Sequence, residues 1–409
     1  MVEHHISAWN HTFQNKGITA LFPLAGIGIS LFLLQRVFRG KLARGVGFIV
    51  DSIFSQKSRI AIRHTFGHMV TSAITVAAGG SVGLEAPIVS TGAAIGSNTA
   101  HDLRLSYKDT TLLLACGAAS GIAAIFNSPI AGMVFTLEVL MLDFNIPFLI
   151  PLLISTATAT VISQILYPDK FVFLIINGWD MKAIPFYILL GIICGLLSVY
   201  TSFVVEKVEG YFHRRKLGWK TWLLAGLPLS VIIYFIPGLY GEGYSTVTHL
   251  LHGDYNNLVQ GTLLQNVNNR ADAIIVMCTL LILLKSLTAA LTMGAGGNGG
   301  IFAPSLMIGG LFGFLYAFVI NLTGWMALRT PNFIIAAMAG VLAGVMHAPL
   351  TAIFLLAEIT GGYALFVPLM IVVAISYFIT RKYVKHSMYH RQLYHKRVFS
   401  DEKDEQDHF

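Results

Sequence analysis

The stretch "GGSVGLEAP", from Gly79 to Pro87, places one carboxylate, that of Glu85, among glycines in a region that otherwise has the apolar character of a membrane interior. A charged side chain at the centre of a bilayer costs roughly 2.5 to 3.5 kcal/mol on insertion scales. Acids inside membranes are therefore rare, and those that are kept usually serve a function. The stretch predicts a polar site inside a membrane protein.

The composition of the whole chain supports a membrane location. The 409 residues are 55% hydrophobic and only 11% charged, and the mean hydropathy is +0.69, whereas soluble domains carry about 25% charged residues. A helix needs about 20 apolar residues to cross a bilayer. Runs that reach or approach this length predict a polytopic protein with helical spans; they lie at Ile18–Leu34, Phe148–Leu166, Ile184–Val204, Trp222–Ile236, Ala273–Leu291, Gly309–Ile320 and Tyr363–Ile379.

Basic residues gather in three clusters, Arg36–Arg44, His213–Lys220 and Arg381–Arg397, and the formal net charge is +7. Clusters beside spans are typical of cytoplasmic loops, so they favour membrane topology over nucleic-acid binding. We expect the polar start, residues 1–17, to lie outside and the tail, residues 381–409, to be cytoplasmic and partly disordered. No signal peptide is predicted, because no basic segment precedes the first apolar run.

The three cysteines, Cys116, Cys194 and Cys278, lie in apolar segments without the spacing of metal ligands. We expect buried packing residues rather than disulfides or a metal site. No cofactor is predicted from any motif.

Two regions repeat at a nearly constant offset. "GGSVGLEAPIVSTGAAIG" at Gly79–Gly96 aligns without gaps on "GGNGGIFAPSLMIGGLFG" at Gly296–Gly313, 217 residues later. "AIFNSPIAGMVFTLEV" at Ala124–Val139 aligns on "GVMHAPLTAIFLLAEI" at Gly344–Ile359, at an offset of 220. The shared order indicates two homologous halves, and the sequence leaves open whether they run parallel or inverted.

Glycines followed by proline and an apolar run predict a helix start whose amides are open to approach. Such a start carries about half a positive charge and binds anions without a cationic side chain. Interrupted helices at matching positions of two halves indicate a transport site. The ionised Glu85 would then compete with an anion for the amides. The alternative is that Glu85 permanently caps the helix start. The cost of keeping a charged group inside the membrane favours instead a carboxylate that gates the anion site.

Glu138 and Glu358 occupy equivalent positions of the repeat, each near the end of an apolar run. We expect this pair to be structural, with each carboxylate accepting hydrogen bonds from backbone amides near a helix end.

From Ile18 to Tyr389 the chain resembles the CLC family of chloride channels and proton-coupled chloride transporters. "GLEAP" resembles the family's Gly-Lys/Arg-Glu-Gly-Pro motif, "GGIFAP" its Gly-x-Phe-x-Pro motif, and "FNSPIAGMVFTLEV" the helices between them. "HSMY" resembles the segment that carries the pore tyrosine, here Tyr389. The resemblance implies an all-α polytopic membrane protein with an inverted two-fold internal repeat and discontinuous helices that meet at a central anion site. It also implies a homodimer in which each subunit has its own pathway.

Carried over residue by residue, the resemblance makes Glu85 the gating glutamate. The amides of Leu84, Glu85 and Ala86 would line an outer anion site. Those of Ile301 and Phe302, with the hydroxyl of Tyr389, would line a central one. The family's Gly-Ser-Gly-Ile-Pro motif, whose serine contacts the central anion, falls on "GVGFI", so that Gly45, Val46 and Gly47 would line the central anion site.

Several positions depart from the family pattern. Val46 replaces a serine and cannot donate a hydrogen bond, so weak, easily dehydrated anions should compete better than usual. Val139 replaces the glutamate that transfers protons in the family's exchangers. Leu84 replaces a lysine or arginine, which weakens the positive field at the outer mouth. The first half, residues 1–204, is expected to lack an N-terminal helix; the second half covers 205–380, and the pore-tyrosine segment and short tail cover 381–409.

The residues favour an anion channel gated by protonation of Glu85, with a proton-coupled chloride or anion antiporter as the alternative; Val139 favours the channel. Fluoride specialisation is weaker, since "GGIFAP" and Tyr389 follow the chloride pattern. An intramembrane hydrolase would need Gly-x-Ser-x-Gly or His-Glu-x-x-His, and neither occurs; a scaffold without transport is a further alternative. The expected partners are chloride-like anions, protons, a second copy and the lipid bilayer, in a cell membrane of bacterial inner-membrane type, and no enzyme activity is expected.

Overall fold

The computed structural model describes residues 16–55, 57–140, 146–167, 178–215, 217–260, 262, 264–265 and 267–389. Within these ranges the regular structure is helical, which confirms the predicted all-helical membrane fold. The one pairing of extended backbone that they contain is a single antiparallel bridge between Gly83 and Gly300. Most of the polar start and of the C-terminal tail lies outside the described residues, and so do the predictions made for them.

The chain forms helices of very different lengths, from 8 to 30 residues. In chain order they are α2 (Lys16–Phe32), the π-helical turn η1 (Leu33–Val37), α3 (Gly47–Phe54), α4 (Arg63–Ala77), α5 (Glu85–Asp102), α6 (Tyr107–Phe126), α7 (Pro129–Val139), α8 (Ile146–Leu166), α9 (Ile184–His213), α10 (Trp219–Phe235), α11 (Tyr244–Leu251), α12 (Arg270–Gly294), α13 (Phe302–Thr323), α14 (Thr330–Met346), α15 (Pro349–Ile359) and α16 (Phe366–Tyr383). Three short 3₁₀ turns lie at Met181–Ala183, Pro237–Leu239 and Tyr255–Leu258.

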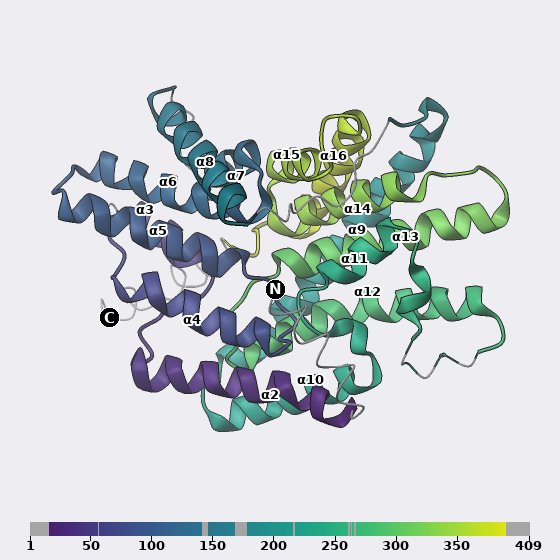
Figure 1. Ribbon diagram of the computed structural model, residues 1–409, viewed down its shortest axis with the longest axis horizontal. Coiled ribbons are helices and arrows are strands. Elements are labelled where there is room, and N and C mark those ends of the chain that lie inside the picture. The colour runs from purple at the N-terminus through teal and green to yellow at the C-terminus, as the bar shows by residue number, and fades with distance from the viewer. Residues whose placement is uncertain are drawn as a thin grey trace, which may run out of the picture.

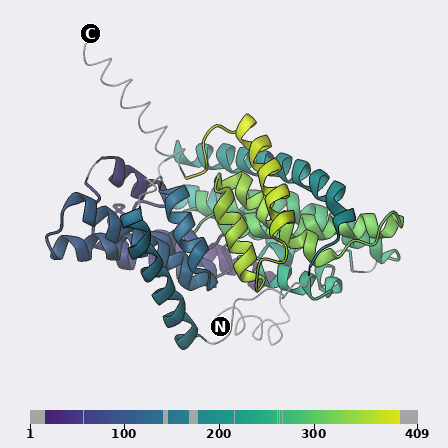
Figure 2. The same cartoon turned by 90° about the horizontal axis from the view of Figure 1, so that it is seen from above.

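The two parts of the sequence occupy different sides of the molecule. Figure 1 shows α3 to α8 on the left and α11 to α16 mainly on the right, and the turned view in Figure 2 keeps this division. The short helices α7 and α15 pack on each other between the two sides, and α2 packs on α10. Consequently, the residues that follow the glycine turns at 79–84 and 296–301 come together although they are far apart in the chain.

Seven helices in the described part of the chain are long and apolar enough to cross a membrane, and six of them overlap predicted runs. The predicted run at Trp222–Ile236 becomes α10, which has only 17 residues. The sequence prediction missed α6, because its alanines and glycines dilute the apolar pattern. These small residues let helices approach: a Cβ on Gly92 of α5 would lie 2.1 Å from the carbonyl oxygen of Gly117 in α6.

Several helices are too short to cross. The helices α7 and α15 have 11 residues each and α3 has 8, so at 1.5 Å per residue they reach about 12 to 16 Å of a hydrocarbon core about 30 Å thick. None of these three helices can therefore cross the membrane by itself. In contrast, α14 is buried on every face from Asn332 to Met346, which is typical of a helix at the centre of a bundle.

Candidate anion site

The starts of α3, α5 and α13 lack a cap from their own N-cap side chains. The N-cap residues of α3, α5 and α13 are Val46, Leu84 and Ile301, and none of them caps its helix through a side-chain hydrogen bond. The first four amides of a helix have no partner within the helix. The amides that follow each of these residues are therefore placed to be satisfied by a group from elsewhere.

The glycine turns before α5 and α13 are paired directly. The amide of Gly83 donates to the carbonyl of Gly300 at 2.9 Å, and the amide of Gly300 donates back at 2.9 Å. The turns are so close that a Cβ on Gly300 would lie 2.9 Å from the Cβ of Ala86, and one on Gly83 would lie 2.8 Å from that of Ala303. Only glycine permits this approach, and it brings the starts of α5 and α13 together.

The turn before α3 is fastened to the same region. Ser90 Oγ of α5 donates to the carbonyl of Gly45 at 3.1 Å. Arg44 donates to the carbonyls of Met293 and Gly297, at 3.1 and 3.3 Å, at the end of α12. Gly45, which has a φ of +77°, allows the chain to turn at this point. Gly45 thus lies against the second turn of α5, and the side chain of Val46 is fully buried.

Glu85 lies at the meeting point of these turns and is only 1% exposed. Its Oε1 accepts a hydrogen bond from the hydroxyl of Tyr244, at the start of α11. Oε2 has no hydrogen-bond partner among the described residues, and the backbone amides of Glu85 and Ala303 lie near the carboxylate. A Cβ on Gly83 would lie 2.0 Å from Oε2, which places this oxygen against the paired turns. The carboxylate therefore occupies the position from which a negative group meets the amides at the start of α13.

Tyr244 is a functional candidate that the sequence reasoning missed. It follows the turn Gly241–Gly243, in which Gly243 has a φ of +96°, so a glycine turn leading into a helix was again the available signal. The amide of Gly241 donates to the carbonyl of Gly79 at 3.1 Å. The buried Lys285 joins the same two segments, since Nζ donates to Ser81 Oγ at 2.9 Å and to the carbonyl of Gly241 at 2.7 Å.

Aromatic rings line one side of the candidate site. Phe302 of α13 lies 5.5 Å from the ring of Phe126 and 6.5 Å from that of Phe135, measured between ring centroids. Phe126 in turn lies 6.5 Å from Tyr244, and Phe135 lies 6.4 Å from Tyr389. The sequence prediction included Phe302 and Tyr389, but it did not identify the other rings, because their apolar surroundings do not distinguish them from core residues.

Tyr389 is 6% exposed, and its hydroxyl has no hydrogen-bond partner in the part of the chain that the structure describes. A buried hydroxyl without a partner costs about 1 to 3 kcal/mol. It is close enough to Glu85 to experience the charge of that carboxylate. Tyr389 therefore offers a hydrogen-bond donor beside Phe135.

The position at which exchangers of the family carry a proton-transfer glutamate is apolar here. Val139 ends α7 and is 1% exposed. With Leu84 and Val46, it leaves three positions around the site without the charged or hydroxyl group that the family pattern has.

Glu138 and Glu358 each cap the start of the helix that carries the other. Glu138, on α7, accepts hydrogen bonds from the amides of Leu350 and Thr351 at 2.9 and 2.8 Å, at the start of α15. Glu358, on α15, accepts hydrogen bonds from the amides of Ile130 and Ala131 at 3.2 and 3.0 Å, at the start of α7. The expected structural role of this pair is confirmed, and the acids satisfy the starts of α7 and α15, whereas those of α3, α5 and α13 have no such cap.

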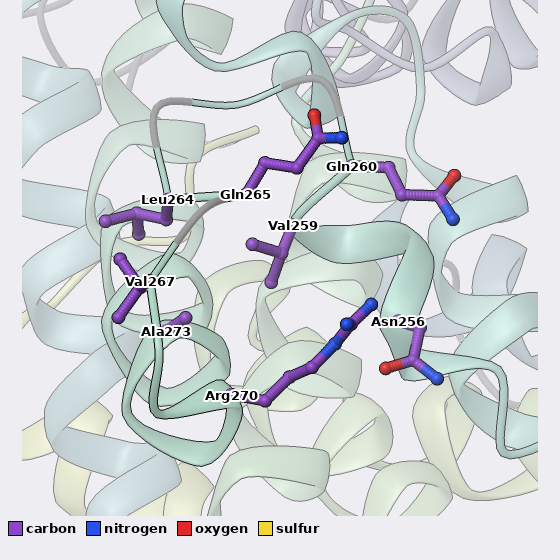
Figure 3. A pocket seen from close by; sticks show the side chains of 8 residues that line it. All are labelled: Asn256, Val259, Gln260, Leu264, Gln265, Val267, Arg270 and Ala273. Carbon is purple, nitrogen blue, oxygen red and sulfur yellow. The ribbon is translucent and has the colours of Figure 1, made fainter.

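The cysteines are free, as expected: Cys194 and Cys278 are buried and Cys116 is partly buried. A hollow of about 450 Å³ is lined by residues from the segment Asn256–Ala273. Figure 3 shows the side chain of Arg270 running between Val259 and Asn256 in this hollow. None of the candidate anion-site residues lines it.

Comparison with known proteins is consistent with this geometry. Residues 26–381 match the family model of the voltage gated chloride channel. A protein of Ralstonia nicotianae that is named as a ClcB-like chloride channel protein is 29% identical over 384 residues, which cover 91% of this chain and 85% of the relative. The H(+)/Cl(−) exchange transporter ClcA of Vibrio cholerae is 31% identical over 311 residues, which cover 71% of this chain and 60% of the relative.

Two solved structures share the fold. A slow cyanobacterial Cl−/H+ antiporter superposes with a TM-score of 0.77 at 21% identity, over 96% of this chain and 90% of the other. A CLC-type fluoride/proton antiporter superposes with a TM-score of 0.76 at 24% identity, over 95% and 91%. The relative from Ralstonia nicotianae is named as a channel protein, whereas the relative from Vibrio cholerae is named as an exchange transporter.

Proposed function

The chain belongs to the CLC family of voltage gated chloride channels and transporters, and from this premise we propose that it exchanges a chloride-like anion for protons, with Glu85 as the group that couples them. The family consists of anion transporters and channels, not of enzymes. The observation that carries the proposal is the position of the Glu85 carboxylate, which is buried against the starts of α5 and α13 and held by Tyr244.

The coupling follows from competition for the same amides. Ionised Glu85 fills the space that an anion needs, and a carboxylate and an anion repel each other there. Protonation removes the charge, so the side chain can leave and an anion can take its place. Anion occupancy then favours the protonated state and anion departure favours the ionised one. An exchanger needs this linkage between the two ions.

The anion itself would be held mainly by backbone. We assign the outer site to the amides of Leu84, Glu85 and Ala86, and the central site to those of Ile301 and Phe302 with the Tyr389 hydroxyl. Two observations support this assignment: the N-cap residues of α5 and α13 provide no side-chain cap, and the Tyr389 hydroxyl has no partner among the residues that the structure describes. Gly45, Val46 and Gly47 would also line the central site, where the fully buried side chain of Val46 offers no donor.

We further propose that the chain is an inverted repeat, with halves at residues 1–204 and 205–380 followed by the segment 381–409. The bridge between Gly83 and Gly300 joins equivalent turns in antiparallel fashion, as a two-fold axis requires. The reciprocal caps of Glu138 and Glu358 support the same symmetry, because an exchange of the two halves maps each contact onto the other.

A passive channel is the second candidate, and Val139 is the observation that favours it. Without a carboxylate at this position, protons lack the inner route that the family's exchangers use. The protein would then conduct anions whenever Glu85 is protonated, and it would move no protons against their gradient.

We also propose that the protein is a homodimer in a bacterial inner membrane. The helix α8 is the least buried of the candidate spans, with 17% of its apolar window inside the molecule. Its exposed side offers an apolar surface for lipid or for a second copy. Cross-linking of the reconstituted protein tests the dimer, since a monomer yields no cross-linked pair at low protein-to-lipid ratio.

The experiment that separates exchange from passive conduction uses proteoliposomes that contain the purified protein. An imposed chloride gradient should drive protons uphill, and a pH-sensitive dye inside the vesicles measures this movement while an electrode follows chloride. Chloride flux without proton movement would establish the channel instead. Absence of flux for chloride and for other small anions would contradict both candidates.

A further inference from the structure

A pair of buried histidines lies beside the candidate anion path. His64 and His68 are one turn apart on α4, and residues with this spacing face the same side of a helix. Nδ1 of His64 and Nε2 of His68 are 3.1 Å apart. His64 is 6% exposed and His68 is fully buried. The two imidazoles therefore form a hydrogen-bonded chain that leads inward from the start of the helix.

The start of α4 lies on the cytoplasmic side according to the chain path. Between the basic cluster Arg36–Arg44 and α4 the only helix is α3, with 8 residues, which reaches about 12 Å and cannot cross a membrane. The positive-inside rule assigns the basic cluster to the cytoplasm. His64 is thus the histidine nearer to the cytoplasm, and His68 is the deeper one.

Asn298 determines which histidine nitrogens carry hydrogen. Its Nδ2 lies 3.2 Å from Nδ1 of His68 and donates to Thr71 Oγ1 at 2.7 Å. An amide nitrogen only donates, so Nδ1 of His68 accepts. Nε2 of His68 then carries the hydrogen and donates it to Nδ1 of His64. Both rings are neutral in this arrangement, and His64 keeps its own hydrogen on Nε2, at the outer end of the chain.

The other amide atom of Asn298 is unused. Oδ1 has no hydrogen-bond partner in the described chain, although the residue is only 1% exposed. If the amide turns over, Oδ1 can accept a hydrogen from Nδ1 of His68. Asn298 can therefore stabilise His68 in either neutral tautomer, and a relay that hands on protons needs a neighbour of this kind.

Asn298 also belongs to the turn that builds the anion site. It precedes Gly300, which pairs with Gly83, by two residues, and the candidate amide of Ile301 follows. Its own amide donates to Thr75 Oγ1 at 3.2 Å, and Arg44 holds the carbonyl of the preceding Gly297. The inner end of the histidine chain is thus attached to the same turn that Glu85 contacts from the other side.

The charges around the pair disfavour a stored proton. The cation of Arg63 acts on His64, and each imidazolium would repel its neighbour. Phe48 of α3 stacks on both rings, with centroids 4.8 and 5.7 Å away. Neither ring forms a salt bridge with a carboxylate of the described residues, unlike His249, which pairs with Asp254 elsewhere in the protein. Without a counter-charge, a proton that reaches the pair is passed on rather than kept.

We propose that His64 and His68 form the inner proton-transfer site of this protein. They would replace the glutamate that the family's exchangers carry at the position of Val139. A proton from the anion-site side binds Nδ1 of His68. The hydrogen on Nε2 of His68 moves to Nδ1 of His64, and that on Nε2 of His64 leaves to the cytoplasm. Asn298 then turns Oδ1 toward His68, and before a second proton can follow in the same direction both rings turn over, so that the N–H of each again points toward the cytoplasm. A proton that enters from the cytoplasm runs the same steps in reverse. The proposal rests on the proposed exchange function.

The test measures proton and chloride flux together in proteoliposomes. His64→Gln and His68→Gln keep a polar side chain but cannot pass a proton from one atom to another, so we expect proton flux to fall by about tenfold or more while chloride flux stays within about twofold. The matched control is His101→Gln, an exposed histidine at the end of α5, which should leave the ratio of protons to anions unchanged.

A rescue experiment separates proton transfer from packing. Adding Val139→Glu to His64→Gln restores a carboxylate where the family's exchangers carry one, so proton flux should recover. If His68→Gln loses chloride flux as well, the less buried His64→Gln and its rescue decide the question. Equal proton-to-anion ratios in His64→Gln and wild type would overturn the relay.

Different results would refute the exchange function and the histidine relay. If the wild type drives protons and Glu85→Gln does not, but the histidine variants behave like the wild type, then exchange stands and the relay is wrong. If the wild type drives no protons at all, the exchange function is wrong and the relay falls with it.

Discussion

The hydroxyl of Tyr244 donates a hydrogen bond to the carboxylate of Glu85, across 159 residues of sequence. Two further links hold the segments of these residues together. The amide of Gly241 donates to the carbonyl of Gly79, and Nζ of Lys285 donates both to the carbonyl of Gly241 and to Ser81 Oγ. The segment that carries the tyrosine is therefore fixed to the turn that carries the glutamate. Tyr244 thus stabilises the ionised glutamate in its position against the helix starts.

Tyr244→Phe should make Glu85 easier to protonate, because the ionised form loses a donor while the ring remains. A hydrogen bond to a charged group contributes about 1.5 to 3 kcal/mol, and 1.36 kcal/mol corresponds to one pH unit. The pH of half-maximal anion flux should therefore rise by on the order of one to two units, measured in proteoliposomes over a pH series. Tyr255→Phe, a tyrosine of the 3₁₀ turn Tyr255–Leu258, is the control. A lower midpoint in Tyr244→Phe would contradict the assigned role.

Glu85→Gln should abolish the pH dependence of anion flux and all proton coupling, and leave anion permeation intact or faster. Glutamine has nearly the same shape but no charge, so it mimics the protonated glutamate at every pH. Wild-type flux should increase as the pH falls, because low pH protonates the carboxylate, whereas the variant should give a flat profile. A folded variant with a wild-type pH response would remove Glu85 from the mechanism.

Val46→Ser should shift anion preference toward chloride, since a hydroxyl at the start of α3 can donate a hydrogen bond to an anion, whereas the valine cannot. Val46→Ala is the matched control, because it removes the same bulk without adding a donor. Relative permeabilities from reversal potentials provide the measurement. Identical selectivity in the two variants would mean that Gly45–Gly47 does not contact the anion.

Glu358→Ala should destabilise the protein without altering its selectivity. The amides of Ile130 and Ala131 lose their partner at a helix start inside the membrane, and a buried amide without a partner costs about 1 to 3 kcal/mol. The midpoint of thermal unfolding in detergent should fall, and the same change is expected for Glu138→Ala. Asp102→Ala, an exposed acid at the end of α5, should have no such effect. Unchanged stability in Glu358→Ala would show that water replaces the carboxylate.

Much of the fold could be predicted from local pattern. Long apolar runs predicted most of the spans, because the bilayer imposes one length scale on every crossing helix. The exception, α6, packs through glycines such as Gly117, and hydropathy does not record how closely two helices approach. The glycine turns before Glu85 and Phe302 were also predicted, because glycine and proline act on the backbone locally.

The sequence by itself determined that this is a helical membrane protein with an acid inside an apolar stretch, since both properties follow from residue type and spacing. Only the tertiary structure decided what surrounds that acid. Tyr244, Lys285 and the pairing of Gly83 with Gly300 come from segments more than 150 residues away. A hydrogen bond between distant segments leaves no periodic trace in either of them, and so it becomes visible only when the helices have packed.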